Sequence, residues 1–164
     1  MQILSQKAVS LLKSLVATPS FSREEAATAD LIADFLHENH IPTNRLKNNI
    51  WTCNAYFDPA KPTILLNSHH DTVKPNTAYT RNPFEANEEN GKLFGLGSND
   101  AGGCLVSLIA TFCHFYLRND LKYNLLLAAT AEEEISGKDG MELLFSYLPP
   151  VDFAIVGEPT QMQM

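Results

Sequence analysis

Residues 125–136 read LLLAATAEEEIS, and this stretch decides both the expected fold and the expected chemistry. Its first half is a short, uninterrupted apolar run, which is typical of a strand buried inside a sheet. The run ends at three adjacent glutamates, Glu132, Glu133 and Glu134. Because like charges repel, and do so more strongly when they are partly buried, such a cluster requires either open solvent or cations beside it.

Helical patterns precede this stretch. Apolar residues at helical spacing predict one helix over residues 4–15 and a second that carries residues 31–36 and ends before Pro42. Ser22 followed three positions later by Glu25 predicts a capping box at the start of the second helix.

The remaining segments complete an α/β pattern. A nearly apolar helix is predicted from Asp100 to about Arg118, and its composition requires burial against a sheet. Residues 74–91 are polar and rich in Pro and Asn, which predicts a long surface loop. Strands are predicted over residues 49–57, 63–69, 123–130 and 152–157, and a short helix over residues 137–148. The alternation indicates an α/β fold: a mixed, largely parallel sheet with helices on both faces.

Length, charge and cysteine content exclude several classes of protein. The 164 residues suffice for one domain, and a net charge of −7 argues against non-specific nucleic-acid binding. The longest nearly apolar run, residues 104–117, contains a histidine and is too short to span a membrane. Gln and Ser interrupt the apolar positions of the first residues, so we do not expect a signal peptide there. Cys53, Cys104 and Cys113 lack CxxC spacing, so we expect reduced thiols in a cytoplasmic protein.

Potential metal ligands follow the ends of three predicted strands. They are His69 with Asp71, the three glutamates, and Glu158. Asp100 adds a fourth group at the start of the apolar helix. Ligands of open α/β sheets bind at the carboxyl ends of the strands, and clustered carboxylates with an imidazole suit a pair of divalent ions.

Each of these residues also has a structural interpretation. Asp100 could cap the following helix, and Glu158 with Pro159 could form an ordinary turn. The glycines around Asp100 lack the lysine of a phosphate-binding loop. No Gly-x-Ser-x-Gly elbow is present, which argues against a serine hydrolase.

Four motifs together carry a resemblance to a known family. They are SHHDTV (68–73), GLGSNDAGG (95–103), TAEEEIS (130–136) and VGEPT (156–160). In this order they resemble the zinc-dependent deacylases, a family that includes acetylornithine deacetylase, succinyl-diaminopimelate desuccinylase, aminoacylase and carboxypeptidase G. The similarity covers the whole chain and is greatest to acetylornithine deacetylase. It implies a zinc-exopeptidase-like catalytic domain and a cis peptide bond after Asp100.

The resemblance also implies a role for each residue. Two Zn²⁺ ions, replaceable by Co²⁺ or Mn²⁺, would be held by four ligands: His69, Asp100, Glu134 and Glu158. Asp100 would bridge the ions, with His69 and Glu158 on one and Glu134 on the other. Glu133 would be the general base, and Asp71 would orient the His69 ring without touching metal.

The chain departs from the family at two positions and at its end. Family members usually carry Arg at Leu96 and Lys at Gly102. Their chains also continue through a lid and dimerisation domain to a final His ligand. We therefore expect residues 1–164 to be the amino-terminal part of the metal-binding catalytic domain, inactive alone, of a protein that is homodimeric when whole.

The implied activity is removal of the acyl group from an N-acyl amino acid. N-acetylornithine is the first candidate substrate, which would place the enzyme in arginine biosynthesis. N-succinylornithine, N-acetylcitrulline, succinyl-diaminopimelate and dipeptides are alternatives. A non-catalytic metal-binding or regulatory module is the rival class.

Overall fold

The computed structural model describes residues 2–160 and is built around a mixed five-stranded sheet. The strands lie in the order β1 (Asn44–Leu46), β2 (Asn49–Cys53), β6 (Asn124–Thr130), β3 (Thr63–His69) and β7 (Phe153–Val156). β3 is parallel to both β6 and β7, whereas β2 is antiparallel to both of its neighbours. Four strands therefore share one direction, which confirms the mixed, largely parallel sheet. A separate hairpin is formed by β4 (Asn87–Glu89) and β5 (Lys92–Phe94).

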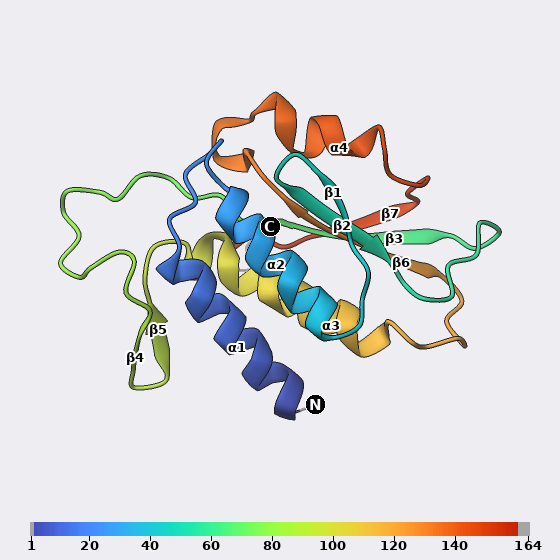
Figure 1. Cartoon of the computed structure of the whole chain (residues 1–164), viewed down its shortest axis with the longest axis horizontal. Coiled ribbons are helices and arrows are strands. Elements are labelled where there is room, and N and C mark those ends of the chain that lie inside the picture. Colours follow the sequence, from blue (N-terminus) through green and yellow to red (C-terminus); the bar gives the residue numbers. More distant parts are fainter. Residues whose placement is uncertain (1, 161–164) are drawn as a thin grey trace.

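Helices cover both faces of the sheet, as predicted (Figure 1). One face packs against α1 (Gln2–Ala17), α2 (Ala26–Glu38) and α3 (Cys104–Phe115), and the other against α4 (Leu143–Phe145). The central strand β6 is buried along its whole length because successive side chains enter opposite cores. Leu125 and Leu127 join the cluster under the three long helices, whereas Leu126 packs with Leu144 of α4.

The helix that follows Asp100 is shorter than the sequence predicts. Residues 98–103 form an irregular turn, in which Asp100 has non-helical backbone angles and the Asp100–Ala101 peptide bond is cis, as the resemblance implied. The regular helix begins at Cys104. It buries Leu105, Ile109 and Phe112 completely, while Ser107 and Thr111 on its opposite side are exposed. α3 therefore packs one face against the sheet, as predicted, while its opposite side is exposed.

The predicted capping box at the second helix was also wrong. α2 begins at Ala26 without a side-chain cap. The Ser22 hydroxyl donates instead to Asp71 Oδ2 at 2.7 Å, and Glu25 accepts the Arg23 amide. Glu25 also accepts the Glu132 amide, and both Asp71 and Glu132 lie too far away in the sequence for a local spacing rule to include them.

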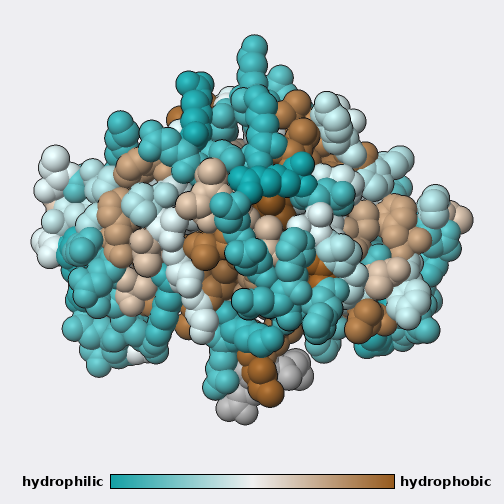
Figure 2. All heavy atoms as spheres, viewed as in Figure 1, coloured by the Kyte–Doolittle hydropathy of each residue, from teal (hydrophilic) through white to brown (hydrophobic). Residues whose placement is uncertain are grey.

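Two further segments differ in detail from the sequence prediction. The long loop is exposed but ends in the β4–β5 hairpin, and the short helix over residues 137–148 is interrupted at Gly140. The side of the molecule shown in Figure 2 is mostly hydrophilic, with smaller apolar areas between the polar side chains. Among the described residues, no helix combines the length and the hydropathy that crossing a membrane requires.

β3, β6 and β7 together determine where the polar residues meet. Because these strands are parallel, their carboxyl ends lie at the same edge of the sheet. β3 ends at His69, β6 leads into the three glutamates, and β7 leads into Glu158. The sheet thus delivers side chains from three separate parts of the sequence to one place.

Candidate metal centre

The four predicted ligands converge at this edge of the sheet. His69 Nε2 lies 3.2 Å from Asp100 Oδ1 and 3.7 Å from Glu158 Oε1. One ligand atom each from His69, Asp100 and Glu134 lie within 4.8 Å of one another. Glu133 Oε2 is 3.8 Å from His69 Nε2, so the predicted base borders the same space. Side chains from four segments therefore surround a volume suited to a metal ion.

The orientation of the His69 ring leaves one nitrogen free for a metal. The side chain is 1% exposed, and its Nδ1 lies 3.0 Å from the Asp71 main-chain oxygen and 3.3 Å from Asp71 Oδ1. Both neighbours are acceptors, so Nδ1 must carry the hydrogen and donate it. Nε2 then presents its lone pair to the cluster in the neutral ring. This arrangement is typical of a metal-binding histidine held by a carboxylate behind it.

Asp71 also holds the segment that follows β6. Its buried carboxylate accepts hydrogen bonds from the Glu133 amide at 3.0 Å, the Glu134 amide at 3.1 Å and the Ser22 hydroxyl. Burial alone would raise the pKa of Asp71, but hydrogen bonds from His69, Ser22 and the two amides outweigh it and lower that pKa. Asp71 therefore stays ionised and fixes the ends of two strands relative to each other.

The cluster concentrates negative charge that a cation would offset. Burial raises the pKa of Glu134, with a further contribution from the charge of Asp100. Burial also raises the pKa of Glu158, to which Glu133 and Asp100 add. One imidazole and three carboxylates form a donor set that Zn²⁺ accepts. The residues present therefore fit a divalent metal, which would relieve the repulsion among the carboxylates of Asp100, Glu133, Glu134 and Glu158.

The apparent zinc affinity of the metal-free chain should rise as pH increases. Burial lowers the pKa of His69, but the hydrogen bond to Asp71 and the charges of Asp71, Glu158 and Glu133 raise it to about 9. Below this pKa zinc must displace a proton, so we expect affinity to increase roughly tenfold per pH unit from about pH 7 and to level off above the pKa. Competition titration against a chelating dye measures the effect. An affinity independent of pH over this range would contradict His69 as a ligand.

Two neighbouring residues point away from the cluster. His70 is buried, with Nδ1 2.9 Å from the Thr28 hydroxyl and Nε2 2.9 Å from the Asn48 main-chain oxygen. Glu132 is also buried, and one of its oxygens accepts the Asp139 amide. Neither side chain belongs to the candidate centre, although both lie next to residues that do.

The cysteines do not take part in the site. Cys53, Cys104 and Cys113 are free, and burial raises the pKa values of Cys53 and Cys113 to about 11. Within residues 2–160, the side chains that come within metal-binding distance of one another include no cysteine. The prediction that the cysteines are reduced thiols agrees with this arrangement.

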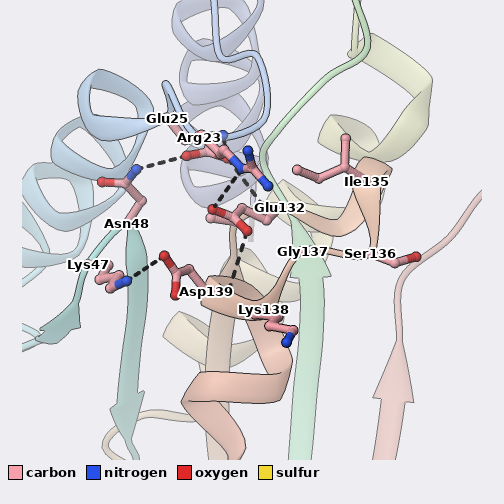
Figure 3. A pocket seen from close by; sticks show the side chains of 11 residues that line it. Arg23, Glu25, Lys47, Asn48, Glu132, Ile135, Ser136, Gly137, Lys138 and Asp139 are labelled. Atoms are coloured by element: carbon pink, nitrogen blue, oxygen red, sulfur yellow. Dashed lines mark hydrogen bonds and ion pairs between the residues drawn. The ribbon is translucent and has the colours of Figure 1, made fainter.

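A cavity of about 590 Å³ lies on the other side of Glu132 (Figure 3). Its lining includes three basic side chains and three carboxylates: Arg23, Lys47, Lys138, Glu25, Glu132 and Asp139. Glu25 and Glu132 lie at the boundary between this cavity and the segment that carries the candidate base. This second group could not be predicted from the sequence, because its members come from three separate segments.

Comparison with known proteins gives matches in both sequence and structure. The model of peptidase family M20/M25/M40 matches residues 65–163. A succinyl-diaminopimelate desuccinylase of Rickettsia bellii is 30% identical over 91% of this chain and 41% of its own length. An acetylornithine deacetylase of Shigella sonnei is 33% identical over 94% of this chain and 43% of its own length. The chain thus spans about two fifths of the length of these curated relatives.

Solved structures share the fold at lower sequence identity. An M20 family metallo-carboxypeptidase from Sulfolobus solfataricus superposes with a TM-score of 0.75 at 24% identity, over 92% of this chain and 37% of that protein. A dinuclear metal-binding peptidase of the M20 family from Bacillus subtilis gives a TM-score of 0.71 at 18% identity, over 95% of this chain and 43% of that protein. These likenesses confirm the fold.

Proposed function

Because the chain belongs to peptidase family M20/M25/M40, we propose that it carries the metal centre of a hydrolase that removes the acyl group from an N-acyl amino acid. The convergence of His69, Asp100, Glu134 and Glu158 at the carboxyl edge of the sheet is the observation that carries the proposal. The names of the relatives supply the reaction class, since both act on acylated amino acids.

The proposed ligands are the four residues of the cluster, and the proposed metal is zinc, for which Co²⁺ or Mn²⁺ could substitute. The dinuclear relative from Bacillus subtilis supports two ions in the whole protein. Ions bound there would activate a water molecule and polarise the acyl carbonyl. His69 would bind through Nε2, because Nδ1 is engaged by Asp71.

Glu133 is the proposed general base. Its side chain is 55% exposed, so it faces the space that a substrate must enter, while its amide is held by Asp71. The carboxylate accepts a proton from water as the water oxygen bonds to the acyl carbon. It then delivers that proton to the amine nitrogen as the carbon–nitrogen bond breaks. Asp71 positions Glu133 and His69 without contacting the substrate.

N-acetylornithine is the proposed substrate, because a relative named acetylornithine deacetylase is 33% identical to this chain. Succinyl-diaminopimelate is the second candidate, because a desuccinylase is 30% identical. The proposal includes a role in arginine biosynthesis, a cytoplasmic location and a homodimeric whole protein. The names of the deacetylase relatives support the first of these.

A substrate panel on the whole protein tests the proposal. It should contain N-acetylornithine, N-succinylornithine, N-acetylcitrulline, succinyl-diaminopimelate and a dipeptide, each assayed after chelation and after zinc is restored. We expect kcat/KM to be highest for N-acetylornithine and to vanish without metal. Hydrolysis of succinyl-diaminopimelate alone would select the second candidate. No hydrolysis of any member would favour a non-catalytic module.

A further inference from the structure

Glu25 is a completely buried carboxylate just before α2, and it lies outside the metal cluster. Its Oε1 accepts hydrogen bonds from the Arg23 amide at 2.6 Å and the Glu132 amide at 3.2 Å. Its Oε2 accepts one from Asn48 Nδ2 at 2.8 Å (Figure 3). Burying a carboxylate is costly unless such donors compensate, so this position is stable only with its partners in place.

The two amides that share Oε1 belong to residues in an uncommon backbone conformation. Arg23 has φ 79° and Glu132 has φ 56°, both in the left-handed region that side-chain-bearing residues rarely adopt. Residues held in this conformation persist only when their surroundings stabilise them. A single carboxylate oxygen therefore supports two unfavourable turns, one of which leads directly from β6 into the candidate base and ligand.

Two buried carboxylates together hold three successive amides. Glu25 accepts the Glu132 amide, and Asp71 accepts those of Glu133 and Glu134. The left-handed turn at Glu132 changes the direction of the chain, so that the next two side chains face the cluster while Glu132 faces the cavity. Loss of the Glu25 contact would leave the Glu132 amide without its acceptor. The side chains of Glu133 and Glu134 would then no longer be held in their direction toward the cluster.

A second connection joins Glu25 to the histidine beside the metal ligand. Asn48 donates from its side chain to Glu25 and accepts at its main-chain oxygen from His70. A main-chain oxygen can only accept, so His70 Nε2 donates to Asn48, while Nδ1 lies 2.9 Å from the Thr28 hydroxyl. Glu25 is therefore bonded directly to the segment that follows β6 and is linked through Asn48 to the segment that follows β3.

We propose that Glu25 is a positioning residue, which orients Glu133 and Glu134 by fixing the turn at Glu132. The kinetic part of this proposal rests on the proposed function, whereas the metal-binding and backbone parts do not. A residue that only stabilises the fold would change the unfolding free energy and leave the geometry around a bound metal untouched. The two roles therefore give different results in spectroscopic and exchange measurements.

Four variants separate the effect of the length of the Glu25 side chain from the effect of its charge. Glu25→Gln keeps the length and the oxygen that accepts both amides, and Asn48 can turn its amide to present oxygen to the new NH₂ group. Glu25→Asp keeps the charge but is one methylene too short to reach the Glu132 amide. Glu25→Ala removes both features. Glu24→Ala is the matched control, because Glu24 is the adjacent glutamate and is exposed.

The first readouts use Co²⁺ alone as the metal probe and amide hydrogen exchange across residues 131–137. We expect Glu25→Asp and Glu25→Ala to weaken Co²⁺ binding by about 10–100-fold, to shift its visible absorption and to speed exchange. Glu25→Gln should stay close to wild type and Glu24→Ala indistinguishable from it. In the whole protein, kcat should fall over the same range in the Asp and Ala variants with KM nearly unchanged.

The outcomes distinguish this proposal from the proposed function. If Glu25→Asp retains wild-type Co²⁺ affinity, spectrum and exchange, the positioning role is overturned, and this variant decides the matter even if Glu25→Ala does not fold. If Glu25→Asp stays closer to wild type than Glu25→Gln in Co²⁺ affinity and amide exchange, the charge of the side chain matters rather than its length. The positioning role is then also overturned. If wild type hydrolyses no substrate while Glu25→Asp alters exchange and Co²⁺ binding, positioning stands and the proposed function fails.

Discussion

Replacement of Glu133 by alanine is expected to lower turnover of N-acetylornithine by the roughly 10²–10⁴-fold that loss of a general base causes. Its carboxylate borders the cluster, 3.8 Å from His69 Nε2, but is largely exposed, as a group that exchanges protons with water and substrate must be. Since the residue is assigned to the water rather than to the ion, zinc content should stay close to wild type. Initial rates beside metal content by mass spectrometry measure both effects.

Glu134→Ala is the matched control, because it deletes the same carboxylate from the adjacent position. Glu134 belongs to the group whose ligand atoms lie within 4.8 Å of one another, so its loss should reduce metal affinity first. Excess zinc should then restore part of the activity. If Glu133→Ala loses zinc while Glu134→Ala keeps it, the two roles are exchanged. If neither variant changes the rate, the hydrolase assignment is wrong.

Replacement of Asp71 by alanine should lower the free energy of unfolding of the metal-free chain by about 3–5 kcal/mol. The carboxylate is fully buried and accepts from Ser22 and from two amides beside the His69 ring. Removing it leaves these donors without an acceptor in the interior, which costs more than the loss of an exposed pair. Urea unfolding in the presence of a chelator measures the change.

Asp120→Ala provides the control for this stability prediction. Asp120 pairs with Arg118 at 2.6 Å, but both side chains are more than half exposed. Such surface pairs contribute about 0–1 kcal/mol to the free energy of unfolding, so this free energy should differ little between the control and wild type. An equally small effect of Asp71→Ala would show that the buried carboxylate does not hold the two strand ends together.

The sheet could be predicted because its strands have simple patterns. The run at residues 125–129 is apolar throughout, and the observed β6 is buried at every position. The same reasoning located β3 and β7, and with them the edge where the candidate ligands meet. Since parallel strands place their carboxyl ends together, the position of the centre followed from topology without any knowledge of side-chain contacts.

Predictions from local residue spacing failed where a side chain forms its hydrogen bond with a residue far away in the sequence. Ser22 and Glu25 have the spacing of a capping box, yet Ser22 bonds Asp71, 49 positions away, and Glu25 bonds the Glu132 amide, 107 positions away. β1 and the β4–β5 hairpin, each strand only three residues long, were missed because so few residues show no periodicity. The roles of Ser22 and Glu25 could therefore not be predicted from the sequence, whereas Asp71 and the candidate ligands were predicted from the resemblance.

The most direct test of the metal centre is anomalous X-ray diffraction at the zinc edge from crystals of the zinc-loaded protein. We expect a peak about 2.0–2.2 Å from His69 Nε2 and from carboxylate oxygens of the cluster formed by Asp100, Glu134 and Glu158. Glu133 should lie outside bonding distance of the ion, with room for a water molecule between them. A zinc-loaded crystal with no anomalous peak beside His69, or with its peak at another group of side chains, would contradict the account.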